Sequence, residues 1–171
     1  TTTIITIMIV GYILIHLPYI THLDYTTTLH EWRQSDVLGV ARNYYNESMN
    51  FFYPRIDGRR NLSGITGMEF PLFNYILALL YTISGKIIPL YGKMMSFGCA
   101  LGSVWLMFKI TIIDNFCKKW PTYPIVILFF AFCNHYFFLF SFTIMPEFLA
   151  LFLSLFGFWK LRFVPIPIRV D

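Results

Sequence analysis

Most of the side chains that could do chemistry in this 171-residue chain lie between residues 21 and 92. The segment carries six carboxylates and five arginines, namely Asp24, Glu31, Asp36, Glu47, Asp57 and Glu69 with Arg33, Arg42, Arg55, Arg59 and Arg60. A carboxylate can take the proton of a hydroxyl nucleophile, and arginine suits bidentate contacts with phosphate. The three cysteines, Cys99, Cys117 and Cys133, are widely spaced, so neither a disulfide nor a zinc site is predicted. We therefore expect the site within residues 21–92.

The composition is far more apolar than that of an ordinary water-soluble domain. Hydrophobic residues make up 57% of the chain and charged residues only 13%, whereas soluble domains average about 45–50% and about 25%. The mean hydropathy is +0.61. The net charge of +4 is too small and too scattered to indicate a nucleic-acid partner. The composition therefore predicts a polytopic membrane protein.

Four segments have the length and apolar character expected of a bilayer crossing, which takes about 20 residues. They are residues 4–20, 94–113, 123–142 and 147–163. The positive-inside rule places Lys118, Lys119 and the cations after residue 159 in the cytoplasm, which leaves residues 21–92 as one large external loop. The predicted fold class is an all-α integral membrane protein, a multi-span helical bundle whose first external loop carries juxtamembrane helices. The predicted location is the plasma (inner) membrane or the ER membrane, with the active face external or lumenal.

Two helices are expected to lie along the membrane within this loop. The first covers residues 32–45, where Val37, Val40, Ala41 and Tyr44 recur at helical spacing on one face and Ser35 or Asp36 could cap the start. The second covers residues 70–81, with Pro71 in its first turn. Between them, residues 50–67 are rich in Gly, Arg and Asn and are predicted to form a flexible or substrate-shaped loop.

Several short runs in this order resemble a known family. They are HEWRQSD at residues 30–36, ARNYY at 41–45, FYPRID at 52–57, EFPL at 69–72 and MPE at 145–147. Together they resemble the first external loop and a later span of the polyprenol-phosphate-sugar-dependent glycosyltransferases of the GT-C superfamily. That superfamily includes the protein O-mannosyltransferases and the lipid A aminoarabinose transferases. The resemblance covers about residues 4–160, so the chain looks like the N-terminal part of such an enzyme and is expected to be incomplete on its own.

The resemblance implies an inverting transfer of a sugar from a polyprenyl-phosphate (for example dolichyl-phosphate) carrier to an acceptor at the external membrane face. The acceptor's proton would go to a loop carboxylate, for which Glu31 is the first choice and Asp36 and Glu69 remain alternatives. The donor's phosphate would be bound by cations, and Glu147 would line the cavity. The candidate cations are Arg33, Arg42, Arg55 and Lys93.

The expected partners are the lipid-linked sugar donor and the lipid bilayer, while the acceptor is left open. No cofactor is assigned, although some family members use a divalent cation, for which His30 is a candidate ligand. The alternative is a non-catalytic lipid-binding membrane subunit or a transporter fragment. A transporter would need charges within its spans, where this chain has few.

Overall fold

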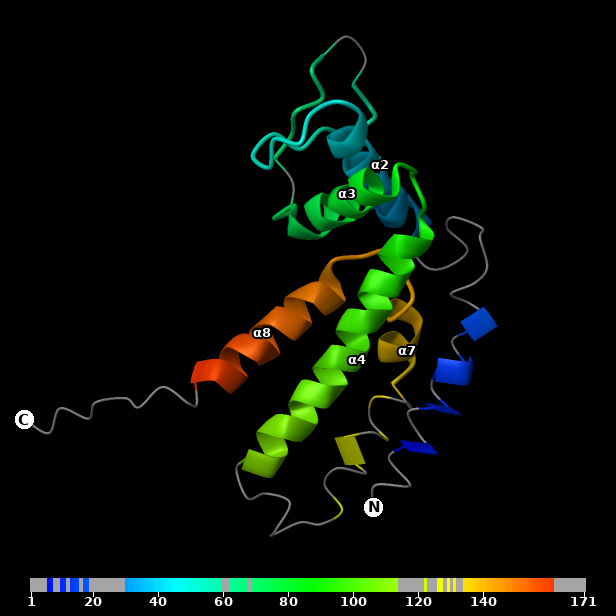
Figure 1. Ribbon diagram of the computed structural model, residues 1–171, viewed down its shortest axis with the longest axis vertical. Helices are drawn as coiled ribbons and strands as arrows, with labels where there is room; N and C mark the ends of the chain where they lie inside the picture. Colours follow the sequence, from blue (N-terminus) through cyan, green and yellow to red (C-terminus); the bar gives the residue numbers. More distant parts are fainter. Residues whose placement is uncertain are drawn as a thin grey trace, which may run out of the picture.

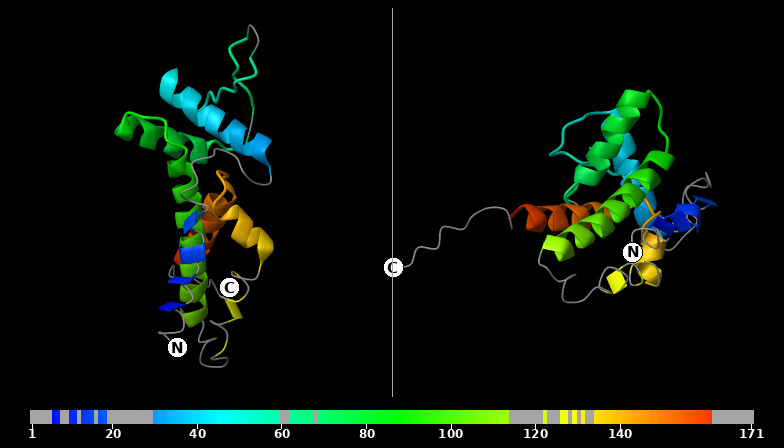
Figure 2. Two further views of the ribbon diagram at one scale, coloured as in Figure 1. Left: turned by 90° about the vertical axis from the view of Figure 1, so that its right-hand side faces the viewer. Right: turned by 60° about the horizontal axis from the view of Figure 1, so that its bottom comes forward.

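The computed structural model is mostly helical, and five helices are present in the part of the chain that it describes. The structure describes residues 30–59, 62–67, 69–113 and 134–161, with a few positions between 6 and 18 and between 122 and 131. The helices are α2 (Glu31–Asn46), α3 (Leu72–Ser84), α4 (Leu90–Ile113), α7 (His135–Phe140) and α8 (Glu147–Leu161). α4 forms the long axis, α2 and α3 lie across its N-terminal end, and α8 packs along it (Figures 1 and 2).

α2 and α3 pack face to face through the apolar stripe that the sequence predicts on α2. Ala41 packs with Phe73 and Leu77 of α3, and Val40 and Tyr44 pack with Ala78 of the same helix; all of these side chains are buried. The helix expected over residues 32–45 is therefore present as α2. Its apolar face packs against another helix rather than against a membrane.

The helix ends differ in one respect from the sequence prediction. α2 begins at Glu31, and its N-cap residue His30 adopts a left-handed conformation (φ 66°) with no side-chain capping bond, so the predicted cap at Ser35 or Asp36 is wrong. Pro71 is the N-cap residue of α3, and Gly85 ends that helix with φ 66°. A residue in the left-handed conformation after the last turn is a common helix stop, because it lets backbone N–H groups hydrogen-bond to the last carbonyls of the helix. Glycine adopts this conformation without strain.

The predicted multi-span membrane bundle is overturned. Within the described residues, no helix combines the length and the apolar character that crossing a bilayer requires. α8 has 15 residues and α3 has 13, below the roughly 20 needed. α4 has 24 residues, but Lys93 and Lys109 interrupt its apolar sequence. The predictions of an integral membrane protein and of a plasma or ER membrane location are therefore corrected.

The other predicted crossings meet the same finding or fall outside the description. In the segment 123–142 the described helix is α7, with six residues, and it begins only after Asn134, whose backbone is extended. Only scattered positions of the segment 4–20 are described, and Lys118 and Lys119 lie outside the described residues. The prediction of transmembrane helices therefore has no support in the helices that the structure describes.

Candidate functional site

Arg33 joins three separate parts of the chain. Its Nη2 atom lies 2.5 Å from Glu69 Oε1 and 3.0 Å from Glu147 Oε1. Arg33 belongs to the first turn of α2, Glu69 precedes α3, and Glu147 is the first residue of α8. The three side chains are partly exposed, at 32%, 58% and 41%. Two carboxylates thus share one guanidinium at the surface, and Glu147 also occupies the helix N-terminus that favours a negative charge.

A cavity of about 290 Å³ opens beside this cluster. Its polar lining comes from His30, Arg33, Asn134 and Glu147, and its apolar lining is mainly aromatic. The apolar lining residues are Tyr136, Phe137, Phe140, Met145, Phe148 and Leu151. The volume is near the lower end of the range typical of small-molecule sites, about 300–1,000 Å³. An apolar pocket with a few convergent polar groups is the usual form of such a site.

Ring contacts hold the walls of the cavity. The His30 ring stacks on Phe140 with centroids 5.9 Å apart, and Phe137 meets Phe148 edge to face at 4.8 Å. Asn134 Oδ1 accepts a hydrogen bond from the Phe137 amide at 3.0 Å, which caps α7. These contacts tie α2, α7 and α8 together around the cavity.

The turn between α7 and α8 is positioned by two buried hydrogen bonds. Gln34, which is 1% exposed, accepts a bond from the Ile144 amide through its Oε1 at 3.2 Å. The Ser96 hydroxyl of α4 donates to the Met145 carbonyl at 3.3 Å. Because Glu147 follows two residues after Met145, these bonds help to set its distance from Arg33.

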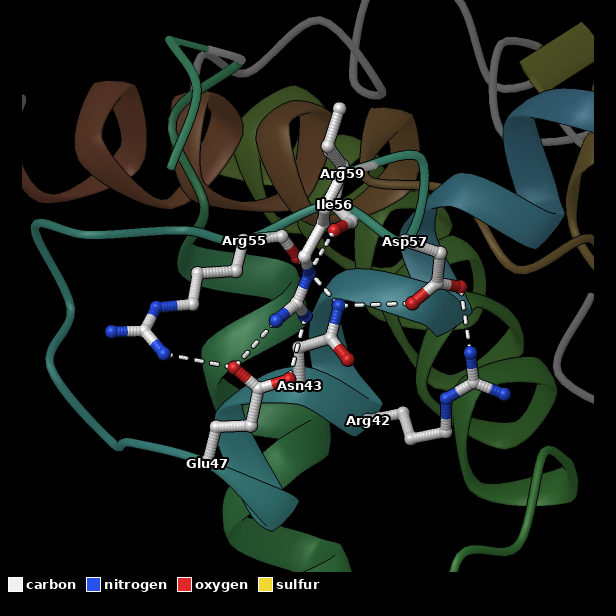
Figure 3. Close-up of polar contacts among 7 residues, drawn as sticks. All are labelled: Arg42, Asn43, Glu47, Arg55, Ile56, Asp57 and Arg59. Atoms are coloured by element: carbon white, nitrogen blue, oxygen red, sulfur yellow. Dashed lines mark hydrogen bonds and ion pairs between the residues drawn. The ribbon is translucent and has the colours of Figure 1, made fainter. Parts of the chain in front are cut away.

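A second polar cluster fastens the loop after α2, and Figure 3 shows its geometry. Asp57 accepts bonds from Arg42 at 2.6 Å and from Asn43 at 3.0 Å, and Asn43 also donates to the Arg55 carbonyl at 2.8 Å. Asn43 is only 6% exposed. Arg42 and Asp57 are half-exposed, so Asn43 is the buried member of this network, and its two hydrogen bonds hold the loop against α2.

Glu47 anchors the same loop by pairing with two arginines. Its carboxylate lies 2.8 Å from Arg55 Nη1 and 2.6 Å from Arg59 Nη2. Hydrogen bonds from Arg59 and then Arg55 lower the pKa of Glu47 from 4.5 to about 2, and the same pairing raises the pKa of Arg59. Ion pairs to α2 and to its end hold the loop of residues 50–67, which argues against the flexible alternative of the prediction and leaves the substrate-shaped one as a prediction.

The predicted site residues therefore separate into groups. Arg33, Glu69, Glu147 and His30 come together, whereas Arg42 and Arg55 are engaged in the loop cluster. Lys93 lies on α4 and is 6% exposed.

The first-choice base takes no part in either cluster. Glu31 and Asp36 are exposed on α2, form no ion pair with any described residue, and do not line the cavity. In the described part of the chain, no three His, Cys, Asp or Glu side chains gather as metal ligands would, His30 included.

Sequence reasoning missed the parts played by Asn43, Glu47, Arg59 and Asn134. Asn43 sits one turn from the end of α2, next to the apolar stripe, which is a position where a buried amide must find partners. The clearest available signal was Glu47, since it precedes two arginines by eight and twelve positions across a glycine-containing loop.

The chain was also compared with known proteins. No family model, no curated protein and no solved structure matches it.

Proposed function

We propose that the chain acts in glycosyl transfer, moving a sugar from a polyprenyl-phosphate donor to an acceptor hydroxyl, with Glu147 as the general base. The observation that carries the proposal is the sharing of Arg33 between Glu69 and Glu147 at the edge of an aromatic-lined cavity. Aromatic rings offer apolar faces on which the C–H faces of a sugar can stack, while Asn134 and Glu147 offer partners for its hydroxyl groups.

The charges suit a base beside a phosphate-binding group. Two carboxylates face one guanidinium, so the charge of one carboxylate is not cancelled and it can accept a proton. Both contacts use Nη2 of Arg33, and its Nη1 and Nε hydrogens, which form no ion pair with a described residue, can bind an oxyanion because arginine carries five donors. Glu147 lines the cavity whereas Glu69 does not, so we assign the role of general base to Glu147 and the orientation of Arg33 to Glu69.

In the transfer, the oxygen of the acceptor hydroxyl attacks the anomeric carbon of the sugar, and Glu147 takes the proton of that hydroxyl. The bond between that carbon and the phosphate oxygen breaks, and the phosphate leaves with the electron pair. Arg33 stabilises the charge that develops on the leaving phosphate. One attack from the face opposite the phosphate inverts the configuration at the anomeric carbon.

The test compares three glutamate-to-glutamine variants at matched expression. Lysates of cells expressing the chain supply the acceptors, radiolabelled polyprenyl-phosphate mannose supplies the donor, and label leaving the lipid fraction is counted. Glu147→Gln is expected to lower transfer about 10²–10⁴-fold, the usual contribution of a general base. Glu31→Gln is the matched control, because the same chemical change is made at an exposed residue outside the cavity.

Each outcome decides a different part of the proposal. Loss with Glu147→Gln and full transfer with Glu31→Gln support it. The reverse result moves the base to Glu31, and a comparable loss with Glu69→Gln alone moves it to Glu69. If the wild-type lysate transfers no more label than a lysate lacking the chain, with several carrier sugars, glycosyl transfer is refuted and a non-catalytic lipid-binding role is favoured.

A further inference from the structure

A cluster of aromatic rings and lysines lies far from the cavity, toward the C-terminal ends of α4 and α8. The Trp105 and Trp159 rings meet edge to face with centroids 6.2 Å apart. Lys109 Nζ lies 5.5 Å from the Trp105 ring centroid, and Lys160 Nζ lies 4.9 Å from that of Trp159 and 5.6 Å from that of Phe156. Trp105 is 51% exposed. We call these five residues the tryptophan–lysine patch.

The local sequence and the helix packing together build this patch. Trp105 and Lys109 are four residues apart on α4, and Phe156 and Lys160 are four apart on α8, so each pair lies on one helix face. The two helices come close because Gly102 has no side chain where the Phe152 ring lies, as a Cβ there would be 2.7 Å from that ring.

Charge is segregated along the described part of the chain. Its six carboxylates all lie on α2, in the segment between α2 and α3, or at the first residue of α8; they are Glu31, Asp36, Glu47, Asp57, Glu69 and Glu147. Figure 1 places α2 and α3 at the end of the molecule opposite to the last turns of α4, with the start of α8 between them and those turns. Neither Lys109 nor Lys160 forms an ion pair with a described residue. In the sequence, the charged residues that follow are Asp114, Lys118 and Lys119 after α4 and Arg162, Arg169 and Asp171 after α8.

We propose that the tryptophan–lysine patch docks on a lipid surface that carries anionic headgroups. Tryptophan rings favour the headgroup level of a bilayer because they are apolar with one polar N–H, and lysine can place its stem on apolar surface and its ammonium on phosphate. Phe156, which is 39% exposed, adds apolar surface to the same contact. Such docking is a surface contact and needs no spanning helix.

A second copy of the chain fits this patch less well than a lipid surface. In a two-fold symmetric contact, the same patch of both copies meets, so the two lysines of one copy would lie close to the two lysines of the other. Like charges brought together in this way repel, whereas the phosphates of anionic lipids attract both lysines.

The test is co-sedimentation of the purified chain with vesicles of phosphatidylcholine alone or with one third phosphatidylserine. The chain is expected to bind the anionic vesicles more tightly, and Lys109→Gln with Lys160→Gln is expected to weaken that binding about fivefold for each lysine removed. Lys86→Gln and Trp32→Ala are the matched controls, because both residues are exposed at the other end of the molecule. Neither control should change the binding.

A fluorescence measurement separates docking from general adhesion. Bromine atoms in the acyl chains of the lipids quench tryptophan fluorescence on contact. Quenching of that fluorescence should be strong in a variant that keeps Trp105 and Trp159 and absent in one that keeps only Trp32. The proposal is overturned if both vesicle types bind equally, or if Lys86→Gln weakens binding as much as the paired lysine variant. It is also overturned if the chain forms a dimer that Trp105→Ala dissociates without vesicles. Sugar transfer is not measured, so this result and that of the transferase test are independent.

Discussion

Two of the three glycines of α4, Gly98 and Gly102, lie in contrasting surroundings, and the same substitution at each should have opposite effects on stability. A Cβ built at Gly102 lies 2.7 Å and 2.8 Å from ring atoms Cε2 and Cδ2 of Phe152 in α8. A Cβ at Gly98 meets no atom within 4 Å. We predict that Gly102→Ala destabilises the protein and that Gly98→Ala stabilises it.

The magnitudes follow from two terms, one of which is common to both sites. Alanine is favoured over glycine within a helix by about 1 kcal/mol, because glycine loses more backbone entropy on folding. At Gly102 the new methyl group would have to recover about 1 Å of separation to reach a normal carbon–carbon contact of about 3.5–4.0 Å. Overpacking of this kind costs about 1–3 kcal/mol. The helix term cancels between the variants, so they should differ by about 1–3 kcal/mol in unfolding free energy.

Chemical denaturation of both variants and of the wild type measures this difference. The comparison holds when the unfolding free energy falls with denaturant concentration at the same slope for all three proteins. A double-mutant cycle with Phe152→Ala supplies the control, since Gly102→Ala should become neutral or favourable once the ring is gone. If Gly102→Ala and Gly98→Ala stabilise the protein equally, α4 and α8 do not approach closely at Gly102 and our account of their packing is refuted.

Three further outcomes are expected. Gln34→Leu leaves the buried Ile144 amide without its acceptor, which should lower the free energy of unfolding by about 1–3 kcal/mol in thermal or chemical denaturation. The control, Asp36→Asn at an exposed position, should change that free energy by no more than about 0.5 kcal/mol. If the two variants are equally stable, the buried hydrogen bond is contradicted. The pKa of Glu47 is lowered in the fold, so its ionised carboxylate contributes fully to stability above pH 4.5, and that contribution is lost as the pH falls toward 2. The difference in unfolding free energy between the wild type and Glu47→Gln should therefore shrink over that pH range. A difference that stays constant would argue against the ion pairs. Burial raises the pKa of the Cys99 thiol, so peptide-resolved alkylation at neutral pH should be slow there, and rapid labelling would show that the thiol is accessible.

Local patterns predicted the helices that flank the site. Apolar spacing placed a helix over residues 32–45, and α2 covers Glu31–Asn46 with the predicted face buried. Helix periodicity depends on neighbouring residues alone, so the sequence carries it directly. The residues proposed for chemistry at Arg33, Glu69 and Glu147 were also visible by type.

The membrane crossings were the main error, and the reason is physical. Hydropathy measures how apolar a segment is, not what its side chains touch. In α8, the Phe148 ring packs against Phe137 of α7, and the Phe152 ring packs against α4 at Gly102. An apolar side chain that packs on its own fold has the same hydropathy as one that faces lipid.

The sequence by itself determined that helices form around residues 32–45 and 70–81 and which face of α2 is apolar, because these properties depend on residues within a few positions of one another. Only the tertiary structure decided which charges share a site. Arg33 meets Glu69 across 36 positions, and it meets Glu147 because hydrogen bonds to Gln34 and Ser96 hold the turn before α8. Contacts at such separations depend on how whole helices pack, which no local pattern encodes.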